Sequence, residues 1–226
     1  MSRPFVYVNM AATADGKITS AAREYPRFTS DHDRTTMDRL RAEADALLVG
    51  ARTLRADNPS FRVRTREMRD YRDSLGKPPG LLRVAVSASL ELGPASRFFD
   101  GPDDGAKIIA TVEDAPAERR ADLADRAEIW NCGRAEVDLD RLLRRLAARG
   151  VERLLVEGGG ELNWALVRRD LVDEIYVTIA PALLGGREAP TLLEGPGFSM
   201  EEQRRLRLVE LNREGDELYC RYAVVR

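Results

Sequence analysis

The stretch LLVEGGGELNWAL, residues 154–166, runs from an apolar strand pattern through three glycines into a helical pattern. A strand that leads directly into a helix is the repeating element of an α/β fold. Gly158, Gly159 and Gly160 would leave backbone N–H groups unhindered at the N-terminus of that helix, a favourable place for an anion. A tight turn needs only one glycine, so the triplet favours a pyrophosphate site, with a plain turn as the alternative.

The alternation of strands and helices extends along most of the chain. Apolar strand patterns cover residues 5–11, 45–50, 82–87, 107–112, 153–158 and 174–180, and helical patterns cover 30–44, 115–127, 138–150 and 161–172. Strands that are apolar throughout and separated by helices predict a mostly parallel sheet covered on both faces. Residues 205–225 instead show two alternating runs about a turn rich in Gly and Asp, which predicts an antiparallel hairpin. The fold class is therefore α/β with a mixed sheet, in one domain over residues 1–226.

The glycine stretch departs from the dinucleotide-binding fingerprint of Rossmann folds. Asn163 stands where the third glycine of G-x-G-x-x-G belongs, and the unit lies late in the chain. A nucleotide at this place would therefore be held by another α/β fold. Glu157, at the carboxyl end of the strand, would point into the crevice where open α/β sheets hold ligands, or would cap the helix.

Composition excludes several classes of function. The chain has 226 residues with a formal net charge of −2, so no overall field attracts nucleic acid or anionic lipid. Among its 36 basic residues only Lys17, Lys77 and Lys107 are lysines, and arginine is the residue suited to bidentate phosphate contact. Cys132 and Cys220 lie in no metal or redox spacing, and no apolar run approaches the roughly 20 residues that span a bilayer. Since the N-terminus also lacks the layout of a signal peptide, we expect a cytoplasmic protein with reduced thiols and no metal.

The segment NMAATADGKITS, residues 9–20, leads from a strand into Asp15, Gly16 and Lys17. Taken alone, these residues predict a turn, with the glycine at positive φ and the aspartate bonded to nearby backbone. The functional alternative is that the small residues admit a flat ring at the end of the strand, where Lys17 would supply a proton or a positive charge.

Residues 40–64 combine a helix, an apolar strand, a short element beginning near Thr53 and a basic end. Residues 57–59, with the sequence Asp-Asn-Pro, predict a turn. Arg41 and Arg64 flank the strand, and both would meet one phosphate if the turn folds the chain back. The alternative for each arginine is an exposed surface position.

Other local signals concern connections and helix ends. Residues 62–79 are densely charged and end in two prolines, and because acidic residues are interspersed we expect a solvated connection rather than a polyanion-binding loop. Ser30 is expected to cap the N-terminus of a helix, and Gly150 to follow the C-terminus of another. The only histidine, His32, lacks the partners that a catalytic histidine needs.

Four segments in this order resemble the reductase domain of riboflavin biosynthesis, a relative of dihydrofolate reductase: NMAATADGKI (9–18), LRAEADALLVGARTLRADNP (40–59), LLVEGGGELNWAL (154–166) and LVDEIYVTIAPALLGG (171–186). The resemblance covers nearly the whole chain. It implies a dihydrofolate-reductase-like three-layer α/β/α fold. It also implies reduction of a ribosylaminopyrimidine 5′-phosphate to its ribitylamino form by hydride from NADPH, at carbon 1′ of the sugar. The deaminase domain of bifunctional members has no counterpart here, so the expectation is a stand-alone reductase.

The resemblance also implies roles for individual residues. The implied cofactor contacts are Ala11, Thr53, Asp57, Ser87, Gly158, Gly159, Gly160, Glu161 and Leu162, and the implied substrate contacts are Arg41, Phe61, Arg64 and Glu157. Lys17 matches a lysine near the reacting sugar carbon, and Lys17 or Glu157 would assist proton transfer. The segment SAS, residues 87–89, lacks an arginine directly after the serine, which leaves the preference for NADPH over NADH open.

Two alternatives remain beside this reading. One is a reductase of a dihydropterin, a folate-like ligand or a specialised-metabolite pyrimidine, and the other is a protein that binds a nucleotide or flavin precursor without catalysis. Arg41 and Arg64 favour a phosphorylated small-molecule substrate. The resemblance further implies a homodimer built in part by residues 172–186, for which a strand in the core is the alternative.

Overall fold

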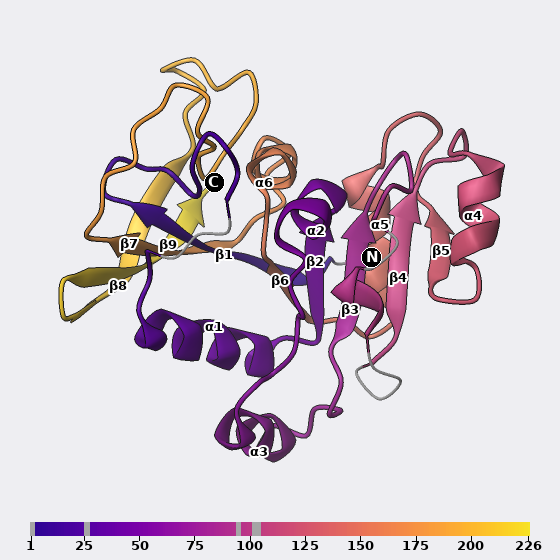
Figure 1. The fold of residues 1–226 in the computed structure, drawn as a ribbon, viewed down its shortest axis with the longest axis horizontal. Helices are drawn as coiled ribbons and strands as arrows, with labels where there is room; N and C mark the ends of the chain where they lie inside the picture. Colours follow the sequence, from indigo (N-terminus) through magenta and orange to yellow (C-terminus); the bar gives the residue numbers. More distant parts are fainter. Residues whose placement is uncertain (1–2, 25–27, 94–95, 101–104) are drawn as a thin grey trace. The chain divides into compact units, whose positions relative to one another are not determined.

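The computed structural model of the chain describes residues 3–24, 28–93, 96–100 and 105–226 (Figure 1). These residues form nine strands, six α-helices and one short 3-10 helix, η1 (Arg97–Phe99). The strands are β1 Phe5–Thr13, β2 Ala46–Gly50, β3 Leu82–Val86, β4 Lys107–Thr111, β5 Glu128–Asn131, β6 Arg153–Val156, β7 Glu174–Ala180, β8 Arg205–Glu214 and β9 Glu217–Val225. The helices are α1 Asp31–Glu43, α2 Ala51–Asp57, α3 Arg66–Ser74, α4 Ala117–Leu123, α5 Leu139–Ala148 and α6 Gly160–Val167.

The chain divides into two compact units. Unit 1 comprises residues 1–5 and 38–155, and unit 2 comprises residues 6–37 and 156–226. In unit 1 the strand order is β5-β4-β3-β2-β6, and β2, β3, β4 and β5 pair in parallel (Figure 1). In unit 2 the order is β1-β7-β9-β8, with β1 parallel to β7 and β9 antiparallel to both of its neighbours. The predicted α/β class, with a mixed, mostly parallel sheet and a C-terminal antiparallel hairpin, is confirmed.

Apolar residues at regular spacing build the core of unit 1. The residues of β2 from Ala46 to Val49 are fully buried, as expected for a strand covered on both faces. The leucines of α5 recur at helical spacing and are all buried: Leu139, Leu142, Leu143 and Leu146. Asp138 caps this helix by accepting a hydrogen bond from the Arg141 N–H at 2.9 Å, and Gly150 follows its end with a φ of +90°. The prediction for Gly150 is therefore confirmed.

A polar cluster in unit 2 fixes the start of α1. Ser30 Oγ accepts hydrogen bonds from the backbone N–H groups of His32 and Asp33, so the predicted N-cap is confirmed. Glu217 on β9 in turn accepts from the Ser30 backbone N–H at 2.7 Å and from its hydroxyl at 2.6 Å. His32 packs edge-on against the Tyr219 ring, with 4.8 Å between the ring centroids.

Three elements differ from the expectation drawn from the sequence. The solvated connection expected at residues 62–79 contains α3, because Thr65 caps that helix and a buried arginine, Arg72, fastens its other end. β5 is missing from the prediction because its sequence, EIWN, is polar at both ends and only Trp130 is buried. Helix α6 ends at Val167, earlier than predicted, and Asp170 takes a φ of +56° shortly after it. Among the described residues, the structure has no helix with the length and apolarity required to cross a membrane.

Candidate active site

The glycine loop follows β6 directly. Glu157 is half-buried at the end of the strand, and Gly159 is the N-cap of α6. Because glycine has no side chain, the cap residue itself satisfies none of the first N–H groups of the helix, so these N–H groups and the positive end of the helix dipole favour an anion. The predicted strand is therefore β6, and the glycine loop and helix that follow it belong to unit 2.

Packing also accounts for two of the three glycines. Gly158 has a φ of +78°, and a Cβ added there would lie 2.9 Å from the Met10 sulfur. A Cβ on Gly160 would lie 2.7 Å from the Thr191 carbonyl oxygen and 2.6 Å from Glu194 Cγ. Backbone cannot give way as easily as a flexible side chain does, so Gly160 is the position that tolerates substitution least. The close contacts that favour glycine at these two positions are thus made by the protein itself and not by a ligand.

Residues 189–195, here called the strap, cross the start of α6. The Glu194 N–H donates to the Gly160 carbonyl at 3.0 Å, and Asn163 Nδ2 donates to the Leu192 carbonyl at 3.0 Å. A Cβ on Gly195 would lie 2.3 Å from the Trp164 ring. Asn163, which occupies the place of the third glycine of a Rossmann fingerprint, therefore holds the strap against the glycine loop.

Lys17 stands on a tight turn whose other side contacts the strap. Thr13 N–H donates to the Lys17 carbonyl at 2.9 Å, the Lys17 N–H donates to Thr13 Oγ1 at 3.0 Å, and Gly16 has a φ of +81°. Lys17 Nζ donates to the Ala189 carbonyl at 3.1 Å, and Lys17 forms an isolated β-bridge with Thr191. The predicted turn is confirmed, and it carries Lys17 to the strap that also touches the glycine loop.

Asp15 stabilises this turn. Its carboxylate accepts hydrogen bonds from the Thr13 hydroxyl at 2.5 Å and from the Gly185 N–H at 2.6 Å. These bonds, that of the Thr13 hydroxyl first, lower the pKa of Asp15 to about 2. The carboxylate therefore stays ionised at neutral pH and fastens the segment around Gly185 to the turn that bears Lys17.

The basic pair lies in unit 1. Arg41, near the end of α1, is buried, and its Nη1 donates to the Arg62 carbonyl at 3.1 Å. Arg64 Nε lies 3.7 Å from Asp38 Oδ1, one turn before Arg41 on the same helix, and the Arg64 side chain is 40% exposed. The loop therefore folds back onto α1, which is the condition that the sequence sets for a shared phosphate.

Phe61 and the end of α2 shape the same loop. Phe61 is 1% exposed with a φ of +41°, and its ring packs edge-on against Phe98 at 6.4 Å between centroids. The Phe61 side chain is thus part of the core, and its contact with a substrate stays a prediction. Asp57 is the last residue of α2 and Asn58 is its left-handed C-cap with a φ of +42°, so the end of a helix stands where the sequence predicts a turn. Asn58 Oδ1 accepts from the Arg97 N–H at 2.6 Å.

Thr53 and Asp57, both half-buried, belong to helix α2. Burial raises the pKa of the Asp57 carboxyl above its ordinary value. Ala11 is half-buried on β1, opposite Thr178 of β7. The cofactor contacts implied for these residues stay predictions.

Ser87 directly follows β3 and is buried, and its hydroxyl has no hydrogen-bond partner within the described ranges. Arginines from other parts of the chain contact the residues that follow Ser87. Arg119 Nη1 donates to the Ser89 carbonyl at 2.9 Å and lies 2.7 Å from Glu91 Oε1, and Arg55 Nη1 donates to the Glu91 carbonyl at 2.5 Å. The sequence could not indicate these contacts, because Arg119 lies 30 residues beyond Ser89.

Each unit thus assembles a part of the predicted set. Unit 2 brings Lys17 and the glycine loop to the same strap, and unit 1 brings Arg41 and Arg64 to the same helix. Asp38 and Asn163 hold these groups, and neither is predicted from the sequence to do so. The available signals are positional: Asp38 precedes Arg41 by one helical turn, and Asn163 replaces an expected glycine.

Comparisons with known proteins agree on one family. The model of the RibD C-terminal domain matches residues 4–219. The chain is 37% identical over 214 residues to a 2,5-diamino-6-ribosylamino-4(3H)-pyrimidinone 5′-phosphate reductase of Archaeoglobus fulgidus, and the match covers 95% of each chain. A protein of the same name from Methanothermobacter thermautotrophicus is 37% identical over 223 residues, with 98% of this chain and 99% of the relative covered.

Solved structures share the fold. A pyrimidine reductase-like protein from Corynebacterium diphtheriae matches with a TM-score of 0.87 and 24% identity, over 99% of this chain and 92% of that chain. RibD of Acinetobacter baumannii matches with a TM-score of 0.78 and 22% identity, over 99% of this chain and 59% of that one. At these identities the likeness shows the fold alone.

Proposed function

The chain belongs to the RibD C-terminal domain family, and on this premise we propose that it is a 2,5-diamino-6-ribosylamino-4(3H)-pyrimidinone 5′-phosphate reductase of riboflavin biosynthesis. The observation that carries the proposal is the 37% identity to a reductase of that name over 95% of both chains. Because the family match spans both units, we treat residues 1–226 as one reductase domain. The family resemblance found in the sequence is confirmed.

The proposed substrate contacts are Arg41, Arg64, Phe61 and Glu157. The phosphate would be met by Arg41 and Arg64, because the loop that bears Arg64 folds back onto the helix that bears Arg41. Glu157 follows the carboxyl end of β6, and α/β sheets place groups that act on ligands at the carboxyl ends of their strands. The two arginines of unit 1 favour a phosphorylated pyrimidine over a dihydropterin.

The proposed cofactor is NADPH, and the residues present fit a dinucleotide. The start of α6 offers N–H groups at Gly160, Glu161 and Leu162 behind an N-cap without a side chain, which suits a diphosphate. We assign further contacts to Ala11, Thr53, Asp57, Ser87, Gly158 and Gly159. When bound, NADPH would supply the hydride that reduces the sugar carbon.

The proposed catalytic residues, Lys17 and Glu157, would move protons. Opening a ribosylamine ring to an imine removes a proton from the exocyclic nitrogen and adds one to the ring oxygen. The Lys17 ammonium group would donate to the oxygen, and the Glu157 carboxylate would accept from the nitrogen. The strap and the Asp15 turn would hold Lys17 in place for this transfer.

The test is the loss of NADPH absorbance in the near ultraviolet with three substrates offered separately: the diamino ribosylaminopyrimidine phosphate, its deaminated counterpart and dihydrofolate. We expect oxidation with the diamino compound and a lower kcat/KM when NADH replaces NADPH. Oxidation with the deaminated compound alone would show that deamination of the pyrimidine precedes the reduction of the sugar. Oxidation with dihydrofolate alone, or tight NADPH binding without any turnover, would overturn the proposal in favour of a pterin reductase or a binding protein.

The Gly160→Ala variant tests the glycine loop. An added Cβ would lie 2.7 Å from the Thr191 carbonyl oxygen, so the strap or the start of α6 must shift. We expect the Kd for NADPH to rise by about 10-fold or more, equivalent to about 1.4 kcal/mol. The control is Gly150→Ala, which strains a backbone at φ +90° in open space and should lower stability without changing this Kd. Equal Kd values for both variants would contradict the assignment.

We also propose a homodimer, built through the hairpin of β8 and β9. All residues of β8 are exposed, and β9 is its only strand neighbour in the part of the chain that the structure describes. The register places Leu206, Leu208 and Leu211 opposite Val224, Tyr222 and Cys220, so these side chains share one face. An exposed edge strand with an apolar face favours association with another sheet.

The charges of β8 support pairing with a second copy. Arg205 and Arg207 lie near its beginning, and Glu210, Arg213 and Glu214, which together carry a net charge of −1, lie towards its end. An antiparallel, two-fold pairing of β8 with itself would set the basic end of one copy against the acidic end of the other. β7, by contrast, is paired on both sides, so the strand within the predicted interface at residues 172–186 is a core strand of unit 2.

The Leu208→Glu variant tests this interface by sedimentation. Leu208 is 48% exposed, and a charge there should convert the dimer into a monomer, because it would be buried in an apolar contact. Met200→Glu is the control, since Met200 is also exposed but lies outside the hairpin. If Leu183→Glu dissociated the dimer and Leu208→Glu did not, the interface would lie in the segment after β7 and not in the hairpin.

A further inference from the structure

Two buried charged side chains join α1 and α3 in unit 1. Neither of them is among the residues proposed to contact the substrate or the cofactor. Asp38 on α1 is 0% exposed, and Arg72 on α3 is 1% exposed. A buried charge is costly unless hydrogen bonds compensate its loss of water, so the partners of these two groups indicate what they do. The partners of Asp38 lie at the start of α3, and those of Arg72 lie mainly at the end of α1.

Asp38 contacts the residues at the start of α3. Its Oδ1 accepts from the Arg64 backbone N–H at 2.7 Å, and its Oδ2 accepts from the Thr65 N–H at 2.9 Å and the Thr65 hydroxyl at 3.1 Å. Thr65 is the N-cap of α3, with its hydroxyl accepting from the Met68 N–H at 3.3 Å. A carboxylate at this place also interacts favourably with the positive end of the helix dipole.

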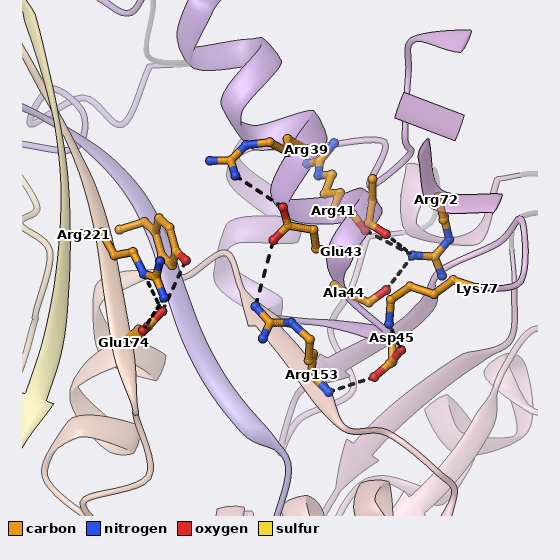
Figure 2. Close-up of polar contacts among 12 residues, drawn as sticks. Arg39, Arg41, Glu43, Ala44, Asp45, Arg72, Lys77, Arg153, Glu174 and Arg221 are labelled. Carbon is orange, nitrogen blue, oxygen red and sulfur yellow. Dashed lines mark hydrogen bonds and ion pairs between the residues drawn. The ribbon is translucent and has the colours of Figure 1, made fainter. Parts of the chain in front are cut away.

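Arg72 contacts the end of α1. Its Nη1 donates to the carbonyl oxygens of Arg41 at 3.3 Å, Ala42 at 3.0 Å and Ala44 at 2.6 Å, as Figure 2 shows for Arg41, Ala44 and Arg72. Its Nε donates to the Pro78 carbonyl at 2.6 Å. The last carbonyls of a helix lack partners within the helix, and a cation is favourable there. Each helix is therefore capped by a buried charge from the other.

This reciprocal capping includes the backbone of Arg41 and Arg64, the two arginines proposed above to bind the phosphate. Arg72 bonds the Arg41 carbonyl, and Asp38 bonds the Arg64 N–H. The Asp38 carboxylate lies closer to the backbone of Arg64, at 2.7 Å, than to its guanidinium, at 3.7 Å. Asp38 thus acts mainly on the position of the loop, and the Arg64 side chain remains partly exposed.

We propose that Asp38 is a positioning residue for the substrate phosphate, which sets Arg64 relative to Arg41 with Arg72 as its counterpart. The inference rests on the proposed function, because it needs a phosphorylated substrate. Two arginines bind one phosphate well only when their geometry is held to within about 0.5 Å by surrounding hydrogen bonds. The chain supplies this support from the same helix turn that carries Arg41.

The test is Asp38→Asn, which keeps the shape but turns a carboxamide towards the N–H groups of Arg64 and Thr65. We expect the KM for the phosphorylated pyrimidine to rise by about 10- to 100-fold. We expect kcat to stay within about 3-fold and the Kd for NADPH to stay unchanged, because the loss concerns substrate binding. Asp70→Asn is the control on α3, since Asp70 is exposed and pairs only at the surface with Arg66.

The dephosphorylated substrate separates positioning from a general structural role. Asp38→Asn should leave kcat/KM for that compound unchanged, as should Arg64→Met, whereas both variants should lose selectivity for the phosphate. An equal loss for both compounds in Asp38→Asn, with selective loss in Arg64→Met, would overturn the inference and leave the proposed function standing. Absence of turnover by the wild-type chain with the phosphorylated pyrimidine would overturn the function itself.

A second variant keeps the test decisive if Asp38→Asn does not fold. Thr65→Val removes one of the three donors to Asp38, together with the hydroxyl that caps α3 at the Met68 N–H, and leaves the carboxylate in place. We expect a KM for the phosphorylated substrate about 3-fold higher, with kcat unchanged. An unchanged KM in this variant would contradict the role of Asp38.

Discussion

Lys17→Met is expected to lower kcat by roughly 10²- to 10⁴-fold, the range typical for loss of a group that transfers a proton. Methionine keeps the length of the side chain but removes the charge and the proton. The turn beneath it should persist, because Thr13 and Asp15 hold it through the backbone and not through the lysine side chain. The Kd for NADPH should therefore change little.

Single-turnover kinetics with saturating NADPH would measure this effect apart from cofactor binding. Lys77→Met is the matched control: Lys77 pairs with Asp45, so its loss should affect stability and leave kcat within about 3-fold. If Lys17→Met and Glu157→Gln both turned over within a few-fold of the wild type, neither residue would be catalytic.

Arg72→Met is expected to reduce the free energy of unfolding by about 3–5 kcal/mol, because it removes a charged donor that satisfies several carbonyl oxygens at once. The variant leaves the carbonyls of Arg41, Ala42, Ala44 and Pro78 without the donor that now satisfies them. Each buried carbonyl without a partner costs about 1–3 kcal/mol, and relaxation of the loop would recover part of the total.

Urea unfolding followed by circular dichroism would measure the loss. Arg66→Met, at an exposed position on the same helix, serves as the control and should stay within about 0.5 kcal/mol of the wild type. Arg72→Lys should fall between the two, because one ammonium group retains the charge but cannot reach all four carbonyls. Similar losses in Arg72→Met and Arg66→Met would show that the reciprocal capping contributes nothing.

Local patterns predict much of this fold because they report properties of neighbouring residues. Apolar runs mark β1, β2 and β7 within a few residues of their bounds, and helical spacing marks α1 and α5. Side-chain capping at Ser30 and the glycine at position 150 depend only on the adjoining turn. Elements with few apolar residues are missed by such patterns. β5 is polar at both ends with only Trp130 buried, and α3 has the composition of a solvated loop.

The candidate site divides in the same way. The glycine triplet, the Asp15 turn and the two arginines are visible as motifs, and all of them lie within residues 4–219, which the family model matches. Their roles stay predictions. The residues that hold these motifs are not visible as such. From the sequence, Asn163 is only a departure from the Rossmann glycine pattern. The structure shows that its side chain donates a hydrogen bond to the Leu192 carbonyl.

The sequence by itself determined the α/β alternation, the C-terminal hairpin and the family of the chain. Only the tertiary structure decided which charges are buried: Asp38 reaches Arg64 across 26 residues, and Arg72 reaches Arg41 across 31. Most of the 36 basic residues are arginines, and the residue type alone does not distinguish a buried arginine from an exposed one. The distinction depends on which backbone groups need a partner once the helices have packed, and no local pattern contains that information.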